Sequence, residues 1–295
     1  MALGVTYPSN RIRPSAGVVT AIDSAAIEAI EIDLFLEALY QVRGADFRGY
    51  DRAGLAYRLH GAMRECGVAS ISGLQDRILR SRPAAEALIR TLSLRPAGLF
   101  DDCAGVRSLR AVLVPYLRSC PLPKIWIAES TSAEDVFALV ILLIEEGLYD
   151  KTLIFVTAAN EALLAETRLG AFPAERLTQY ESSYRASGGA KALADYCDAR
   201  DAKMVFSPAL RGNLIWAQYD LAADRSFNEF QFILCRRVLP EFGTTLRRRA
   251  LQLFADSLSP FGILSADALD DLQSAPMSLQ FQAVSQEHGL YRRIV

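Results

Sequence analysis

The sequence predicts an α/β fold preceded by an all-helical domain, and three observations support this. From Lys124 onward, short apolar strands alternate with helical segments, the pattern of a mostly parallel sheet covered by helices. Before that point, apolar side chains recur at three- and four-residue spacing, the period of an amphipathic helix. The stretch WIAESTSAEDVFAL then joins a strand to a helix through a Ser/Thr turn, a junction that often binds a nucleotide-like cofactor.

Four segments account for the helical domain, which we place at residues 25–95. They read IEAIEIDLFLEALYQVRG, YDRAGLAYRLHGAMRECG, SGLQDRILRS and PAAEALIRTLSL, and the first two end in glycine, a favoured helix stop. The Pro/Ser/Gly-rich residues 1–24 in front of them predict a flexible arm.

Residues 96–295 form the predicted α/β domain. The strands are KIWIAES, KTLIFVTAA, NLIWAQYD, FQFILCRRV and GILSA, and the helices are VFALVILLIEEGL, EALLAETRLG and TLRRRALQLFADSL. The closing pair SLQFQAV and GLYRRIV predicts an antiparallel hairpin. A polar insertion at about 173–212 leaves no room for a further full strand–helix unit.

Composition excludes several classes of function. A net charge of −2 and a pI of about 5.8 give no electrostatic basis for binding nucleic acid or an anionic membrane. No apolar run reaches the roughly 18 residues of a membrane span, which argues against membrane insertion. The five cysteines are scattered and the histidines are only His60 and His288, so we expect a cytoplasmic protein with no disulfide framework, metal site or nucleophilic dyad.

Six features occur in an order typical of one family. The helical domain is followed by the WxAxST turn, ANEALLAETRLGAF, CRRVLPEF, SLSPFGIL and GLYRR, over about residues 27–295. In this order the chain resembles the CheR family, the bacterial glutamate methyltransferases of chemotaxis receptors. The resemblance implies a Rossmann-like class I methyltransferase sheet of seven strands, the last antiparallel. It also implies methyl transfer from S-adenosylmethionine (SAM) to a receptor that docks on a basic helix of the helical domain.

The chain departs from the family pattern at positions that contact the cofactor. Where the family reads S-x-N-x-T-x-F-F-R-D, this chain reads SLRPAGLFDD, so Arg95, Ala97 and Asp101 replace asparagine, threonine and arginine. Where the family reads STGEEPYS, this chain reads STSAEDVF, and of the two glutamates only Glu134 remains.

Further departures follow the later strands. Ala158 takes the place of the family aspartate that holds the ribose hydroxyls, unless Asn160 or Glu161 takes over that contact. Asp220 replaces an asparagine, and in CRRVLPEF, Arg237 and Glu241 replace the asparagine and tyrosine of CRNVLIYF. The predicted positions of the former SAM crevice are Arg95, Asp101, Glu129, Ser130, Thr131, Glu134, Ala158, Asp220 and Arg237.

These losses predict a catalytically degenerate protein. Removing one charged hydrogen-bond partner costs about 1.5 to 3 kcal/mol, so losing three or four weakens SAM binding by roughly three powers of ten or more. Asp101 also places a negative charge where the resemblance implies the methionine carboxylate. We therefore predict no catalytic residue and no cofactor, and a pseudo-methyltransferase that binds proteins or senses a ligand in bacterial chemosensory or surface-attachment signalling.

Two alternatives remain open. One is an active but diverged SAM-dependent protein-glutamate O-methyltransferase. The other is a crevice that binds an anionic nucleotide through Arg95, Arg236 and Arg237, although arginines are more often solvated surface side chains. For a protein partner, the resemblance implies docking on the second helix, where Arg52, Arg58 and Arg64 lie.

Overall fold

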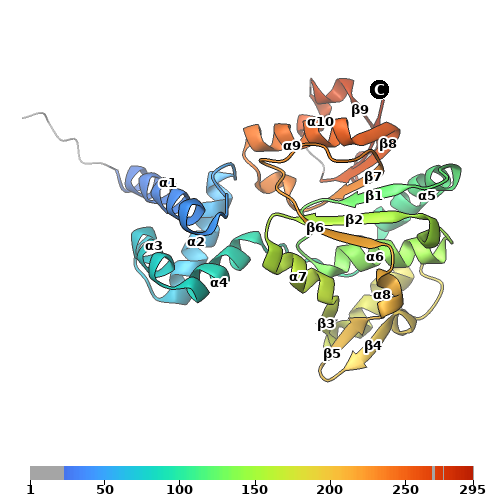
Figure 1. Cartoon of the computed structure of the whole chain (residues 1–295), viewed down its shortest axis with the longest axis horizontal. Helices are drawn as coiled ribbons and strands as arrows, with labels where there is room; N and C mark the ends of the chain where they lie inside the picture. The colour runs from blue at the N-terminus through green and yellow to red at the C-terminus, as the bar shows by residue number, and fades with distance from the viewer. Residues whose placement is uncertain (1–22, 268–269, 275, 295) are drawn as a thin grey trace, which may run out of the picture.

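The computed structural model describes residues 23–267, 270–274 and 276–294. Two parts are visible in Figure 1, a group of helices and a larger α/β domain. The arm predicted at residues 1–24 falls, apart from its last two residues, outside the described residues.

The four predicted helices of the helical domain are present. They are α1 (Ser24–Arg43), α2 (Arg52–Cys66), α3 (Ile71–Arg80) and α4 (Arg82–Ser93). Gly44 and Gly67 end the first two helices in the left-handed conformation, with φ of 70° and 67°, as the glycine stops predicted. Inward-facing side chains such as Phe35, Leu39 and Leu59 are fully buried and form a core of their own.

A seven-stranded sheet forms the centre of the α/β domain. Its strands are β1 (Lys124–Ile127), β2 (Leu153–Ala158), β6 (Leu214–Gln218), β7 (Phe230–Cys235), β8 (Leu258–Ala266), β9 (Phe281–Ser285) and β10 (Leu290–Arg293). Their order is β6-β2-β1-β7-β8-β10-β9. The first five strands in this order pair in parallel, and β10 is antiparallel to both β8 and β9. The predicted seven strands with an antiparallel last strand are confirmed.

Helices cover both faces of this sheet. They are α5 (Cys103–Ser119), α6 (Ala133–Glu145), α7 (Glu161–Leu169), α9 (Thr244–Ser257) and the short α10 (Asp270–Gln273). The three apolar residues of β1 are buried on both faces of the sheet: Ile125 and Ile127 pack in the core beside α5 and α6. Trp126 points to the opposite core beside α9.

Helix α5 was not among the predicted elements. Its segment CAGVRSLRAVLVPYLRS carries three arginines and Pro115, which obscure the pattern. The signal that identifies it is the four-residue spacing of Leu109, Leu113 and Leu117, which are all buried.

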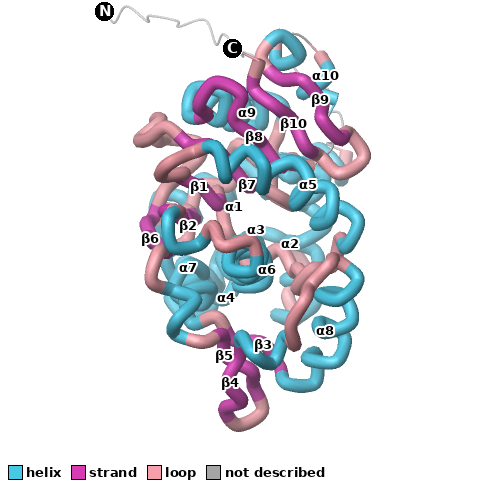
Figure 2. The backbone as a smooth tube through the Cα atoms, turned by 90° about the vertical axis from the view of Figure 1, so that its right-hand side faces the viewer, coloured by secondary structure: helices cyan, strands magenta, loops and turns pink. Residues whose placement is uncertain are grey.

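The prediction that the insertion has no room for a further strand–helix unit was wrong. Residues 171–206 hold strand β3 (Ala171–Pro173), helix α8 (Leu177–Ala186) and strands β4 (Cys197–Arg200) and β5 (Lys203–Phe206). The strands form a separate antiparallel sheet in the order β3-β5-β4, which lies apart from the main sheet (Figure 2). Strands of only three or four residues made this unit possible, and Phe206 anchors it by stacking on Phe137 of α6 at 4.3 Å.

Backbone contacts join the helical domain to the α/β domain next to the 3₁₀ turn Leu239–Glu241. The loop before α2 forms an antiparallel bridge in which Tyr50 lies opposite Phe242. On either side of it, Asp51 N donates to Glu241 O at 2.7 Å and Gly243 N donates to Gly49 O at 2.9 Å. These bonds place the helical domain over the carboxyl ends of the parallel strands.

Candidate functional site

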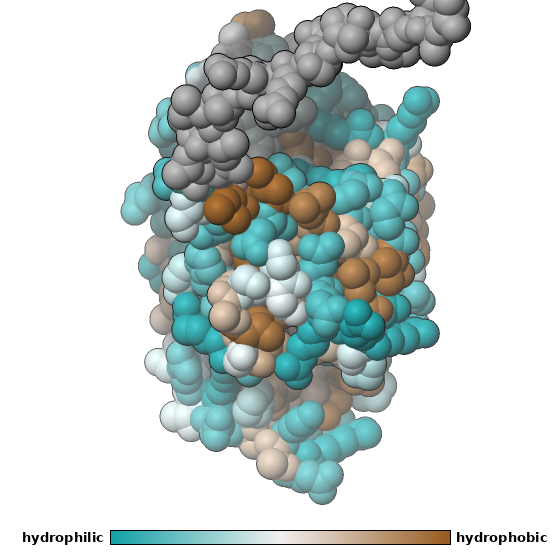
Figure 3. Space-filling model, turned by 90° about the vertical axis from the view of Figure 1, so that its left-hand side faces the viewer, coloured by the Kyte–Doolittle hydropathy of each residue, from teal (hydrophilic) through white to brown (hydrophobic). Residues whose placement is uncertain are grey.

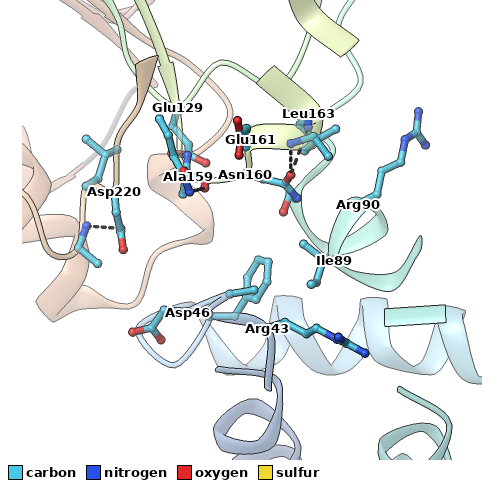
Figure 4. Close-up of a pocket in the computed structure, with 18 of the residues that line it drawn as sticks. Arg43, Asp46, Ile89, Arg90, Glu129, Ala159, Asn160, Glu161, Leu163 and Asp220 are labelled. Carbon is cyan, nitrogen blue, oxygen red and sulfur yellow. Dashed lines mark hydrogen bonds between the residues drawn. The ribbon is translucent and has the colours of Figure 1, made fainter. Parts of the chain in front are cut away.

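A cavity of about 550 Å³ lies where the helical domain meets the carboxyl ends of β1, β2 and β6 (Figure 4). From the α/β domain its walls are Glu129, residues 159–163, Gln218 and residues 220–222. The helical domain supplies residues 43–47, Tyr50 and parts of α4. Ligand pockets commonly have this size and this position at the strand ends of an α/β sheet.

Glu129 enters the cavity because the chain turns sharply after β1. Its φ of 50° is left-handed, which is uncommon for a residue other than glycine. The turn is fixed on both sides, since Ala128 N donates to Leu234 O at 2.9 Å and Ser130 N donates to Thr157 O at 2.7 Å. The carboxylate lies over the end of β2, where it accepts a hydrogen bond from Ala159 N at 3.1 Å.

Burial changes the chemistry of this carboxyl group. Glu129 is 8% exposed, and burial, followed by repulsion from Asp220, raises its pKa to about 7. The hydrogen bond from Ala159 and the charge of Arg95 oppose this rise. Glu129 therefore changes its charge near neutral pH.

Two further polar side chains line the same wall. Asp220 follows β6, accepts a hydrogen bond from Ala222 N at 2.8 Å, and has its pKa raised mainly by burial. Asn160 caps α7, because its Oδ1 accepts hydrogen bonds from Ala162 N and Leu163 N at 2.9 and 3.2 Å. Asn160 and Glu161, the alternative ribose contacts, thus lie in the cavity wall.

Arg95 lies beside this cavity, yet its charge is neutralised within the protein. It is 4% exposed, forms an ion pair with Glu241, and donates to Leu92 O at 2.9 Å. Glu241 also pairs with Arg58 of α2, so one carboxylate holds two arginines at the domain junction. The interpretation of Arg95 as a solvated surface side chain was wrong.

Arg237 is neutralised in the same way at the end of β7. It adopts a left-handed φ of 67° and forms ion pairs with Asp135 at 2.5 Å and with Asp101 at 2.9 Å. Burial lowers the pKa of Arg237, but Asp135 and Asp101 outweigh this effect and raise it. Its neighbour Arg236 pairs with Asp102 at 3.2 Å.

Four of the positions at which the chain departs from the family pattern therefore pair with one another. Arg95 pairs with Glu241, and Arg237 pairs with Asp101. The expectation that these arginines make an anion site is not supported, because each already contacts a carboxylate. The charge of Asp101 is likewise balanced by Arg237.

Of the nine predicted crevice positions, only Glu129 and Asp220 line the cavity. Ser130 is buried in the turn, and Thr131 is half-buried next to it. Glu134 accepts a hydrogen bond from Tyr180 of α8 at 3.0 Å, so its carboxylate contacts the insertion. Ala158 is fully buried in the core, and the residues that follow it, Ala159 and Asn160, form the wall instead.

The three arginines predicted for partner docking occupy different environments. Arg52 pairs with Asp33 of α1 at 2.7 Å, and Arg58 is held at the domain junction by Glu241. Arg64 is exposed near the end of α2. Docking through this helix stays a prediction, and Arg58 takes part only if its ion pair opens.

Within residues 23–267, 270–274 and 276–294, no group of three or more His, Cys, Asp or Glu side chains is arranged to hold a metal ion. Over the same residues, no helix is long and apolar enough to cross a membrane.

Both domains of this chain are similar to domains of known proteins. Residues 30–93 match the model of the CheR methyltransferase all-alpha domain, and residues 104–288 match that of the CheR methyltransferase SAM binding domain. The putative methyltransferase Cher3 of Pseudomonas putida is 33% identical over 264 residues, which cover 90% of this chain and 97% of that protein. The chemotaxis protein methyltransferase 1 of Pseudomonas aeruginosa is 23% identical, covering 74% of this chain and 82% of its own.

Among solved structures, the N-methyltransferase NodS of Bradyrhizobium japonicum WM9 is similar at a TM-score of 0.36 and 12% identity, covering 66% of this chain and 88% of its own. The two family models cover both the helical domain and the sheet domain in the order seen here. The chain therefore belongs to the CheR methyltransferase family.

Proposed function

We propose that this chain is a non-catalytic member of its family that acts in the cytoplasm of a bacterium by binding a protein partner in chemosensory or surface-attachment signalling. The observation that supports it most is the mutual pairing of the substituted charges. Arg95 with Glu241, and Arg237 with Asp101, form internal ion pairs at positions where the family resemblance implies contacts to SAM.

The residues present do not fit the methionine end of SAM. An α-carboxylate needs an uncompensated cation or several backbone donors. The guanidinium of Arg237 is held by Asp101 and Asp135, and that of Arg95 by Glu241. A ligand carboxylate would have to displace one of these carboxylates and would then lie beside it, at a cost that rises as the local dielectric falls.

The surface of the helical domain supports the protein-binding part of the proposal. The face shown in Figure 3 is mainly hydrophilic, with apolar groups between the charges. Helix α1 exposes Ile27, Ile30 and Leu34 by 48%, 52% and 59%. Their three- and four-residue spacing forms one stripe along the helix, the arrangement by which helices pack against helical partners.

Calorimetric titration with SAM and with its demethylated product tests the absence of a cofactor. We expect no dissociation constant below about 50 micromolar, a level within the range of ordinary enzyme substrates. Tighter binding together with methylation of a receptor fragment would refute the proposal in favour of an active, diverged methyltransferase.

A paired substitution makes the titration more informative. Asp101→Arg combined with Arg237→Asn restores the two family residues, removes the internal pair and places a guanidinium at position 101 instead of a carboxylate. If those pairs are what prevents binding, the double variant binds SAM more tightly than the parent chain. The single change Arg237→Asn is the matched control, since it removes the cation without supplying another.

Binding to the cytoplasmic helical fragment of a chemoreceptor tests the partner. Leu34→Glu places a charge in the exposed stripe of α1 and should abolish the interaction. Leu279→Glu is the control, because Leu279 is 71% exposed and lies in the other domain. Equal binding by both variants would show that the stripe is not the docking surface.

A further inference from the structure

The lining of the cavity between the domains holds more carboxylates than cations. Its lining includes six carboxylates and two arginines: Asp46, Glu86, Glu129, Glu161, Glu166 and Asp220, with Arg43 and Arg90. Arg90 donates from Nε and Nη2 to the two carboxylate oxygens of Glu166, each at 2.9 Å. The charges of these two residues therefore neutralise each other at the rim of the cavity. Asp46 and Glu86 likewise pair with Arg48 and Arg82. Among the described residues, the lining carboxylates without an ion pair are therefore Glu129, Glu161 and Asp220, whose charge is unfavourable for an anionic nucleotide.

One carboxylate that lines this cavity has an oxygen that accepts no hydrogen bond from a described residue. Glu129 is more than nine-tenths buried, and its Oε2 accepts from Ala159 N. Among the residues that the structure describes, its Oε1 has no hydrogen-bond donor, and no arginine, lysine or histidine forms an ion pair with it. A buried carboxylate in this state has unused capacity to accept a charged donor.

Asp220 lies beside Glu129 across the end of β2. Glu129 follows β1 and Asp220 follows β6, the strands on either side of β2, and both side chains line the cavity (Figure 4). Neither forms an ion pair with a described residue. Their mutual repulsion contributes to the raised pKa of Glu129. A cation between them would relieve that repulsion and satisfy both groups.

Part of the wall is apolar. Phe47, Tyr50, Ile89, Leu163 and Leu246 line the cavity, with Phe47 and Tyr50 in ring contact at 5.0 Å. Aromatic faces attract organic cations, and aliphatic walls favour methylene groups over water. A bare metal ion does not match this lining, whereas an amine on an aliphatic chain does.

We propose that the cavity binds a small organic cation of the polyamine class, with one ammonium group held between Glu129 and Asp220. The methylene chain then lies along the apolar part of the wall, and a second ammonium group faces Glu161, which also lines the cavity. This goes beyond the proposed function, because a protein that only docks on a partner needs no ligand. It gives the helical domain, which forms half of the cavity, a way to respond to a small molecule.

An ammonium ligand binds Glu129 in its ionised, negatively charged form. The charged groups that act on Glu129 are Asp220 from the loop after β6 and Arg95 from the linker after α4. The titratable groups Tyr50 and Cys235, both buried and neutral, also face it. With a pKa of about 7, the carboxyl is mostly protonated at pH 6 and mostly ionised at pH 8. Affinity for an ammonium ligand should rise by about tenfold between these two pH values.

Calorimetry with spermidine and with putrescine on the full chain tests the proposal. We expect saturable binding at pH 8, and a loss of about tenfold or more in affinity with Glu129→Gln or Asp220→Asn. Glu175→Gln, an exposed carboxylate of the insertion, is the matched control and should bind like the parent chain. The melting temperature of each variant verifies that it is folded.

Three results would overturn the inference. The first is no heat and no melting shift with either amine at millimolar concentration and pH 8. The second is binding that both Glu129→Gln and Asp220→Asn leave unchanged, which would indicate a general charge effect. The third is tight binding of SAM that excludes the amines, and this result alone would also overturn the proposed function.

Discussion

The two ends of the crevice differ in how their charges are balanced. At the end formed by Arg95, Arg237 and Asp101, every guanidinium contacts a carboxylate of the same chain. At the cavity end, Glu129 and Asp220 lack any cation within bonding distance among the described residues. Both ends lie at the carboxyl edge of one sheet, so the fold does not impose this difference.

The comparison teaches that changes of charge at a binding site have two physical outcomes. Where opposite charges are introduced in pairs, they neutralise each other, and neither charge remains available to bind a ligand. Where carboxylates are brought together without cations, burial raises their pKa and leaves a site that a ligand can complete. The three predictions below separate these outcomes, from the largest effect to the smallest.

The largest effect is expected from Glu241→Gln. This change leaves the guanidinium of Arg95, which is 4% exposed, without its counter-charge. Breaking a buried pair in this way costs about 3 to 5 kcal/mol. The free energy of unfolding from urea titration measures it, with the exposed Glu229→Gln as control.

A companion variant tests whether the pair or the apolar environment stabilises this junction. Arg95→Met combined with Glu241→Leu removes both charges and should restore most of the lost stability, because no unpaired charge remains. If the double variant is as unstable as the single one, the junction depends on the hydrogen bonds of Arg95 and not on charge balance.

An intermediate effect, dependent on pH, is expected from Glu129→Gln. The pKa of Glu129 is raised from 4.5 to about 7, so its stability contribution is complete below pH 4.5 and is lost as the pH rises through 7. Glutamine cannot ionise, so the variant should exceed the parent by up to about 3 kcal/mol at pH 8.5 and match it near pH 4.5. Equal unfolding curves at both pH values would mean that the carboxylate is well solvated.

The smallest effect is expected at the rim of the cavity, from Arg90→Gln. Arg90 and Glu166 have 52% and 48% exposed side chains, so solvent screens their interaction. The coupling energy between Arg90→Gln and Glu166→Gln, from the free energies of unfolding in a double-mutant cycle, should be below about 1 kcal/mol. It should fall further in 0.5 M salt, where the screening length is only a few ångströms. A larger coupling that persists in salt would make this pair a structural contact between the domains.

The periodicity of apolar residues predicted the helical domain and the alternation of strands and helices, and the family resemblance supplied the seven-stranded sheet. The alternation around Trp126 and the glycine stops at Gly44 and Gly67 reflect local physics, which a sequence displays directly. Helix α5 was missed because arginines and Pro115 interrupt its pattern, although its buried leucines carry the right spacing.

The site was less predictable because its contacts depend on distant segments. Arg95 and Glu241 are far apart in sequence, and only the folded chain brings them together. Glu129 enters the cavity through a left-handed φ, which the residue type gives no reason to expect. Ala158 was taken for a wall position, but the side-chain alternation of β2 directs it into the core.

The bridge between Tyr50 and Phe242, with Glu241 beside it, bears on how the protein is made. The helical domain leaves the ribosome first, and domains generally fold in that order. Arg58 and Arg95 have no ion-pair partner until Glu241 has been synthesised. The loop before α2 likewise cannot form its bridge until Phe242 has been added. A truncated chain that ends before residue 239 would carry two arginines without their carboxylate and an uncovered aromatic surface at Phe47 and Tyr50. Such a product is therefore expected to be a substrate for chaperones and proteases.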